Sequence, residues 1–196
     1  MSKRGRVLAV ASAIALIVAA VGFVYVAKSR TSAAASRDSS EKSDLASRAS
    51  AGDADAEVKV GLQCLRGTEH PPDYSAAVKW FRQAADSGNA EAEYNLGTLH
   101  QTGRGVPRDY TNALSWFEKA AAQNHAAALY NLGSLYASGR GVTQDSQKAA
   151  HYYVRAAELG DSYAQYNVAQ RCELGRGVAT NLVRPGNGTT WPLSAE

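Results

Sequence analysis

Residues 90–125 read AEAEYNLGTLHQTGRGVPRDYTNALSWFEKAAAQNH, and this stretch decides the fold. A shift of 36 residues superposes Tyr94-Asn95-Leu96 on residues 130–132 and on residues 166–168. The same shift aligns the tetrapeptide GRGV, which occurs at 103–106, 139–142 and 175–178, and an aromatic pair at 80–81, 116–117 and 152–153. Several motifs that recur in phase at one fixed period predict an array of structural repeats.

Each copy contains two segments with helical periodicity. In the first, Leu96 and Leu99 fall on one face beside Gly97, where the missing side chain lets a neighbouring helix approach closely. The second has an apolar stripe at spacings of three and four residues, made of Leu114, Phe117, Ala120 and Ala121. The repeat is therefore predicted to be a helical hairpin.

The link between the two helices carries its own signals. Gly103 and Gly105 tolerate the positive φ that ends a helix. Asp109 stands where a side-chain oxygen caps the second helix, and the same phase is occupied by Asp73, Asp145 and Asn181. These residues fix the position of the second helix in each copy.

The motifs resemble the Sel-one-like repeat family, relatives of the tetratricopeptide repeats with the pattern AxxxYNLGxLYxxGxGVxxDxxxAxxWxxxAAxxG. The resemblance covers roughly residues 38–181. It implies an all-α fold, a right-handed α-solenoid of helical hairpins built from 36-residue, TPR-like repeats. It also implies an adaptor that binds protein partners rather than an enzyme.

A membrane segment is predicted ahead of the repeats. After a basic segment at residues 1–6, residues 7–27 contain no charged side chain, and a helix of this length spans the hydrocarbon core of a bilayer, roughly 30 Å. A cleavable signal peptide is the competing interpretation, but the apolar core of such peptides runs only about 7–15 residues. We therefore expect an uncleaved transmembrane helix or signal anchor.

The orientation of this span is less sharply defined. Basic residues stand on both sides of it, namely Lys3, Arg4 and Arg6 before it and Lys28, Arg30 and Arg37 after it. The positive-inside balance is therefore nearly even. The very short leading segment favours a single-pass protein of the bacterial inner membrane with the repeats in the periplasm, and a cytoplasmic location is the alternative.

The boundaries of the other predicted segments follow from the 36-residue period. Residues 28–37 form a flexible tether, and residues 38–53 a half-repeat with only a second helix. Repeats one, two and three are 54–89, 90–125 and 126–161, and repeat four is partial, 162–181. Residues 182–196 form an irregular tail, because Pro185, Gly186 and Gly188 fall where a second helix would run.

Charge and cysteine content exclude some classes of protein. Residues 1–50 hold eight Lys or Arg against three Asp or Glu, a net charge of +5, and residues 51–196 hold 13 against 15, a net charge of −2. A mildly acidic repeat domain lacks the footprint of a nucleic-acid binder. Cys64 and Cys172 lie three periods apart, too far in a solenoid for a disulfide. This separates the chain from the cysteine-rich secreted branch of the family, in which each hairpin has its own disulfide and for which β-lactam hydrolysis has been proposed.

No catalytic, cofactor or metal site is predicted. The four histidines, at positions 70, 100, 125 and 151, show no metal-ligand spacing, and no GxSxG motif is present. His100 replaces a tyrosine at a core position and is expected to be packed or partly exposed rather than to bind a metal. A hydrolase acting on cell-wall material or β-lactams is the least favoured alternative.

In related arrays the first helices line the concave face. The resemblance places seven partner-binding residues there, namely Tyr94, Thr98, Gln101, Tyr130, Ser134, Tyr166 and Gln170. Tyrosine offers a large rigid contact with one polar group, which suits a protein or peptide partner. The alternative is that the tyrosines fill the seams between hairpins. Asn95, Asn131 and Asn167 are expected to satisfy backbone groups inside the array.

The sequence therefore predicts a membrane-anchored adaptor that binds a protein or peptide through this face. A secreted effector or regulator, released after cleavage of the leader, is the first alternative. The three GRGV arginines, Arg104, Arg140 and Arg176, are expected to be solvated loop residues on one edge of the array.

Overall fold

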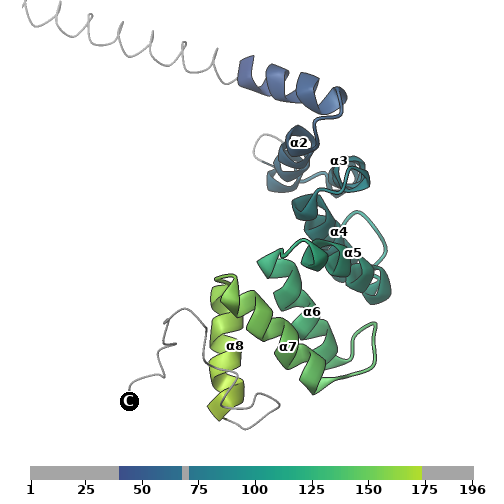
Figure 1. Cartoon of the computed structure of the whole chain (residues 1–196). Helices are drawn as coiled ribbons and strands as arrows, with labels where there is room; N and C mark the ends of the chain where they lie inside the picture. Colours follow the sequence, from purple (N-terminus) through teal and green to yellow (C-terminus); the bar gives the residue numbers. More distant parts are fainter. Residues whose placement is uncertain (1–39, 68–70, 174–196) are drawn as a thin grey trace, which may run out of the picture. The chain divides into compact units, whose positions relative to one another are not determined.

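The computed structural model describes residues 40–67 and 71–173, with side chains up to residue 170 (Figure 1). The chain divides into two compact units, Met1–Ser47 and Arg48–Glu196, and the repeats lie in the second. Residues 40–50, inside the segment predicted as a half-repeat, are helical. The predicted segments 1–6, 7–27, 28–37 and 182–196 lie outside the described residues. Within the described residues, no helix is long and apolar enough to cross a membrane.

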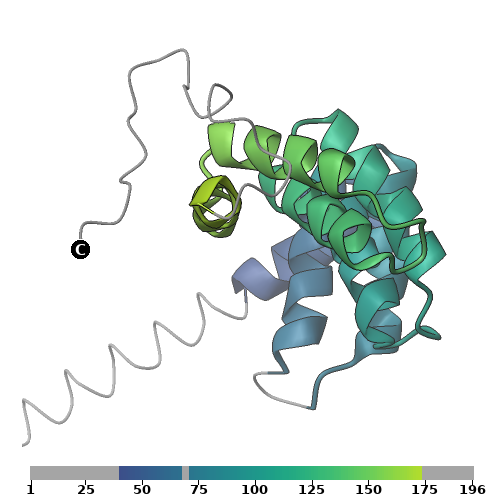
Figure 2. The same ribbon diagram turned by 90° about the horizontal axis from the view of Figure 1, so that it is seen from below.

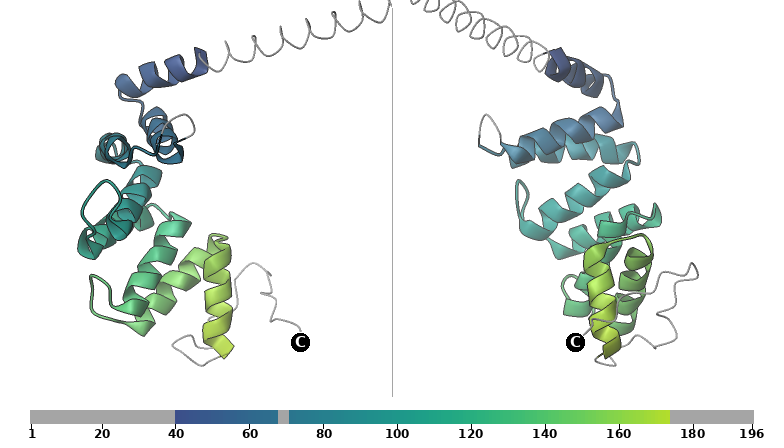
Figure 3. Two further views of the ribbon diagram at one scale, coloured as in Figure 1. Left: turned by 180° about the vertical axis from the view of Figure 1, so that it is seen from behind. Right: turned by 90° about the vertical axis from the view of Figure 1, so that its left-hand side faces the viewer.

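The described part of the repeat unit is all-α, and its helices keep the period of the sequence. They are α2 (Ala54–Arg66), α3 (Tyr74–Asp86), α4 (Ala90–Thr102), α5 (Tyr110–Ala122), α6 (Ala126–Ser138), α7 (Ser146–Glu158) and α8 (Ser162–Glu173). The predicted hairpins are confirmed as α2–α3, α4–α5 and α6–α7, and each second helix also packs on the next first helix. Figures 1 and 3 show the hairpins following one another in chain order, as in a solenoid.

The predicted caps are confirmed at every described copy. Asp73, Asp109 and Asp145 each accept a hydrogen bond from a backbone N–H in the first turn of the second helix. The first helices end at glycines in the left-handed region, with φ of 59° at Gly67, 72° at Gly103 and 69° at Gly139. A cap at each end therefore fixes both helices of the hairpin.

The second glycine of the GRGV motif brings its loop onto the preceding hairpin. A Cβ at Gly105 would lie 2.5 Å from the carbonyl oxygen of Tyr74, and one at Gly141 would lie 2.5 Å from the carbonyl carbon of Tyr110. Both positions also have positive φ. Only glycine fits there, so this residue joins one repeat to the repeat before it.

Inside each hairpin an aromatic ring lies against a glycine of the first helix. Phe117 is fully buried, and a Cβ at Gly97 would come within 2.6 Å of its ring. Gly61 faces Phe81 and Gly133 faces Tyr153 in the same way. The prediction that Gly97 permits close helix approach is confirmed. Around these rings the core consists of alanine and leucine, among them Ala120, Leu96 and Leu132.

The array changes character at α8. Figure 2 views this helix almost along its axis, beside the α6–α7 hairpin. Its Ala164 and Val168 are buried in the same cluster as residues of α6 and α7. At the position of Gly61, Gly97 and Gly133, the fourth copy carries Ala169.

Candidate functional site

The predicted partner-binding residues lie along one stripe of the first helices. We call this stripe the first-helix face and define it by Tyr94, Thr98 and Gln101 on α4, Tyr130 and Ser134 on α6, and Tyr166 and Gln170 on α8. Spacings of three and four residues place each set on one side of its helix. Residues on α4 and α6 are half-buried, whereas Tyr166 and Gln170 are exposed.

The two inner tyrosines of this face also pack in the seams between helices. The Tyr94 ring lies 6.1 Å from the Phe117 ring of its own hairpin and stacks at 4.7 Å on His125, where the next hairpin begins. The Tyr130 ring lies 5.5 Å from Tyr153 and 6.0 Å from Tyr163. Both residues thus have a structural role while part of each side chain stays accessible.

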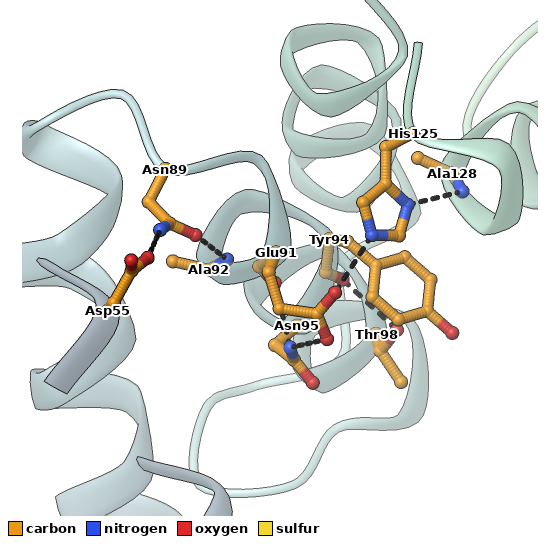
Figure 4. Close-up of polar contacts among 9 residues, drawn as sticks. All are labelled: Asp55, Asn89, Glu91, Ala92, Tyr94, Asn95, Thr98, His125 and Ala128. Carbon is orange, nitrogen blue, oxygen red and sulfur yellow. Dashed lines mark hydrogen bonds and ion pairs between the residues drawn. The ribbon is translucent and has the colours of Figure 1, made fainter. Parts of the chain in front are cut away.

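A hydrogen bond between successive first helices accompanies the rings (Figure 4). The Asn89 side-chain amide caps α4 by accepting from the Ala92 N–H and donates to the Asp55 carboxylate at 3.0 Å. One repeat later, His125 caps α6 by accepting from the Ala128 N–H at 3.2 Å. Its Nε2 lies 3.0 Å from the Glu91 carboxylate.

The two contacts of His125 define its tautomer. Since Nδ1 accepts the backbone N–H of Ala128, the ring proton lies on Nε2 and is donated to Glu91. This hydrogen bond is the main reason that the pKa of Glu91 is lowered, although burial opposes it. Glu91 is therefore an anion on the edge of the first-helix face at neutral pH.

Two of the three asparagines of the YN motif act within their own helices, as predicted, and the structure gives no side-chain hydrogen bond for Asn131 among the described residues. Asn95 donates to the backbone carbonyl of Glu91 at 2.7 Å and to its carboxylate at 3.0 Å. Asn167 donates to the carbonyl of Tyr163 at 2.9 Å. The neighbouring hydroxyl of Thr98 also turns inward, to the carbonyl of Tyr94 at 3.1 Å.

The sequence reasoning missed the residues that cap the first helices. Asp53, Asn89, His125 and Asp161 occupy these positions at intervals of one period. They recur at the same 36-residue spacing that identified the caps of the second helices, so this spacing could have revealed them. Tyr163 was also missed, because the other copies have no aromatic residue at its position, and it is 73% exposed.

Two further groups singled out in the sequence are His100 and the cysteines. His100 is buried, as predicted, and neither ring nitrogen has a hydrogen-bond partner among the described residues. No group of three or more metal-ligating side chains occurs in that part. Cys64 is a half-buried thiol whose pKa is raised, chiefly by burial, and the side chain of Cys172 lies outside the description.

Two of the GRGV arginines are exposed and stack on tyrosines of the preceding repeat. The guanidinium of Arg104 lies 5.5 Å from the ring centre of Tyr74, and that of Arg140 lies 5.7 Å from the ring centre of Tyr110. These contacts are cation–π interactions at a solvated loop. Arg176 lies outside the described residues.

Comparison with known proteins identifies the repeat. The Sel1 repeat matches residues 54–89, 90–125, 126–161 and 162–184. The crystal structure of a protective antigen present in uropathogenic Escherichia coli strains, which displays an SLR fold, is 36% identical with a TM-score of 0.67. The match covers 70% of this chain and 29% of the antigen. No curated protein matches the chain.

Two further solved structures share the fold. A Sel1 repeat protein from Oxalobacter formigenes is 32% identical with a TM-score of 0.60, over 65% of this chain and 53% of that one. Cysteine-rich protein B of Helicobacter pylori is 20% identical with a TM-score of 0.50, over 62% of this chain and 92% of that one. The chain thus spans about a third to a half of the first two relatives. Because the repeat matches most of its residues, the chain belongs to the Sel1 repeat family.

Proposed function

We propose that the chain is an adaptor that binds a protein or peptide partner through the first-helix face. The observation that carries the proposal is a ladder of partly accessible tyrosines on successive first helices, ending in Tyr166, which is 67% exposed. Large aromatic contacts with a polar group are enriched where proteins meet. Membership of a family of interaction scaffolds supports the same conclusion.

The proposed location is a bacterial envelope, with the chain held in the inner membrane by residues 7–27 and the repeats in the periplasm. The support is the uncharged run of these residues and the short basic segment before it. Secretion after leader cleavage is the alternative. The mass of the mature N-terminus separates the two, and protease added to spheroplasts tests the side of the membrane on which the repeats lie.

The binding proposal is tested by crosslinking and affinity capture from native membranes with the full chain as bait. Because Tyr94 and Tyr130 support the fold, we would leave them intact and add charge beside them with a triple variant, Gln101→Arg, Ser134→Arg and Gln170→Arg. The matched control places the same substitutions at exposed positions of second helices, Gln83→Arg, Ser115→Arg and Gln147→Arg.

We expect a discrete partner that is captured by the parent and by the control variant and lost with the face variant. Circular dichroism must show both variants folded. Equal capture by all three baits would show that the partner binds elsewhere. Capture of nothing by the parent would contradict the adaptor itself.

A further inference from the structure

The large apolar side chains that are exposed in the described chain lie close together in sequence. Among the residues whose side chains are described, the large apolar side chains that are exposed are Leu159 at 47%, Tyr163 at 73% and Tyr166 at 67%. They flank the junction at which α7 ends and α8 begins. We call Leu159, Asp161, Tyr163 and Tyr166 the last-seam surface. Clustered apolar exposure of this kind marks a binding site more often than single exposed residues do.

A seam is the contact between one repeat and the next. The polar contact at the seam between repeat three and α8 differs from that at the two earlier seams. In those seams a capping side chain donates to an acid on the preceding first helix, Asn89 to Asp55 and His125 to Glu91. At the third seam the cap is Asp161, and the acid's position is taken by Ala127. An acceptor therefore stands where the other seams have a donor. One Asp161 oxygen accepts from the Ala164 N–H at 2.7 Å, and the structure gives no hydrogen bond for the other within the described residues.

The four residues of the last-seam surface include one acid and no base, although α8 also contains Arg171, whose side chain lies outside the description. The sequences of α4 and α6 contain no lysine or arginine, whereas the second helices carry Lys79, Arg82, Lys119, Lys148 and Arg155. The arginine of α7, Arg155, already donates to the Asn124 side chain at 3.1 Å. The described side chains of the last-seam surface thus combine one carboxylate with two exposed tyrosine rings.

This combination matches one kind of side chain. A guanidinium can donate two parallel hydrogen bonds to a carboxylate while its flat face stacks on an aromatic ring. The chain itself pairs arginine with tyrosine three times, Arg104 over Tyr74 and both Arg108 and Arg140 over Tyr110, so half-buried tyrosines of this array already receive guanidinium groups. Lysine lacks the planar fork and would be recognised less well.

We propose that the last-seam surface binds an arginine-bearing peptide segment of a partner protein, with the guanidinium on Asp161 and the tyrosine rings and with apolar neighbours against Leu159. The proposal rests on the adaptor function and names the chemistry of its partner. The ring of Tyr163 is held from one side by Tyr130, at 6.0 Å, so the partner meets a positioned ring rather than a freely rotating one.

The test uses the full chain in a nonionic detergent and mixtures of labelled nonapeptides with Arg, Lys, Gln or Glu fixed at the centre. We expect binding, measured by fluorescence anisotropy, to rank Arg above Lys, with Gln and Glu far weaker. Asp161→Asn should weaken binding of the Arg mixture by about tenfold, since it removes the charge-assisted bond but keeps a good capping residue. Asp145→Asn, the same change at the cap of α7, is the control and should leave binding unchanged.

The outcomes separate this proposal from the adaptor function. If the mixtures bind without preference and Asp161→Asn has no effect, while the Gln101, Ser134 and Gln170 variant loses binding, the arginine assignment fails and the adaptor survives. If no mixture binds, the arginine assignment fails, and the capture experiment on native membranes decides the adaptor function. A photocrosslinking residue in place of Tyr166 identifies the occupant. Crosslinks to the peptide support the proposal. Crosslinks that form, in the presence of the peptide, to a second copy or to the chain's own residues 182–196 overturn the proposal.

Discussion

Repeats one and two share a backbone but not the polar contacts that it buries. Glu57 and Glu93 occupy the same position of α2 and α4, and both are buried. In repeat two, Gln123 donates to the Glu93 carboxylate at 2.9 Å and to the Gly88 carbonyl at 2.9 Å. In repeat one the position of Gln123 is held by Ser87, and one Glu57 oxygen has no partner among the described residues.

The difference shows that period and backbone can persist while a buried interaction is made, lost or replaced. Burial raises the pKa of both carboxyl groups, and the Gln123 hydrogen bond counteracts this only at Glu93. Repeat three avoids the problem, because Leu129 and Leu159 stand at the two positions. Buried carboxylates are costly unless they are hydrogen-bonded, so repeat one carries the least favourable version.

The largest loss of stability is expected from substitutions at the contact between a helix glycine and a phenylalanine ring, which repeats one and two share. Gly61→Ala and Gly97→Ala each place a methyl group within 2.7 Å of a buried phenylalanine ring. We expect each change to lower the free energy of unfolding by roughly 1–3 kcal/mol, as overpacking of a core typically does. Thermal or urea denaturation of the full chain measures this.

The fourth copy provides the control for this prediction. Ala169 holds the position of Gly97, so Ala169→Gly removes a side chain where alanine is already accommodated. It should cost no more than about 1 kcal/mol, the helix propensity difference. If Gly61→Ala and Gly97→Ala were as mild as this, the close ring contact would not govern the packing of the hairpins.

A second difference between the repeats concerns acid stability. His100 holds the place of Cys64 in repeat one and of Tyr136 in repeat three. Burial lowers the pKa of His100, the nearby Arg82 lowers it further, and Asp109 opposes them. As the pH falls, His100 therefore takes up a proton near pH 6.5 in the unfolded chain but only at a lower pH in the folded chain. Between these two pKa values the unfolded chain binds more protons, so the free energy of unfolding falls as the pH drops.

The substitution His100→Tyr, which copies repeat three, should remove this loss. A single group changes the free energy of unfolding by at most about 1.4 kcal/mol per pH unit. We expect the stability of the parent to fall more steeply than that of the variant between pH 7 and pH 5, measured by urea denaturation. Glu91 affects stability at a lower pH than His100 does. Because the pKa of Glu91 is lowered in the folded chain, the stability that its carboxylate contributes is lost only below about pH 4.5. Parallel curves from pH 7 to 5 would refute the role of His100.

Copying the polar contact of repeat two into repeat one should give a gain. In Ser87→Gln the introduced amide can reach the unpaired oxygen of Glu57, as Gln123 reaches Glu93. We expect an increase of about 1 kcal/mol in the free energy of unfolding, the usual contribution of one hydrogen bond. In a Glu57→Leu background the same change should give no gain, and an equal gain there would show that the amide acts elsewhere.

The fold was predictable from the sequence because its determinants are local and repeated. The period, Gly97, the GRGV glycines and Asp109 each act at a fixed offset, so three copies reinforced one another. The exposed tyrosine of the last seam was not predictable in this way, because Tyr163 departs from the other copies, whereas Asp161 repeats the acidic cap Asp53. Likewise, whether Glu57 finds a donor depends on the reach of a side chain 30 positions away in sequence, which a pattern does not reveal.

The smallest effect is expected at the turn that ends each second helix. Gly52, Gly88 and Gly160 have positive φ there, and repeat two has Asn124 at φ 60°. Asparagine tolerates this region better than other side chains do. Asn124 also accepts from Arg155, so Asn124→Gly relieves strain but loses that bond, and we expect a net change within about 0.5 kcal/mol.

The control distinguishes strain from the lost bond. Asn124→Ala loses the bond and keeps the strain, so it should cost about 1 kcal/mol or slightly more. Gly88→Ala has open space around the added methyl group and should cost about 1 kcal/mol through φ alone. If Asn124→Ala and Asn124→Gly were equally stable in urea denaturation, positive φ would not constrain this turn.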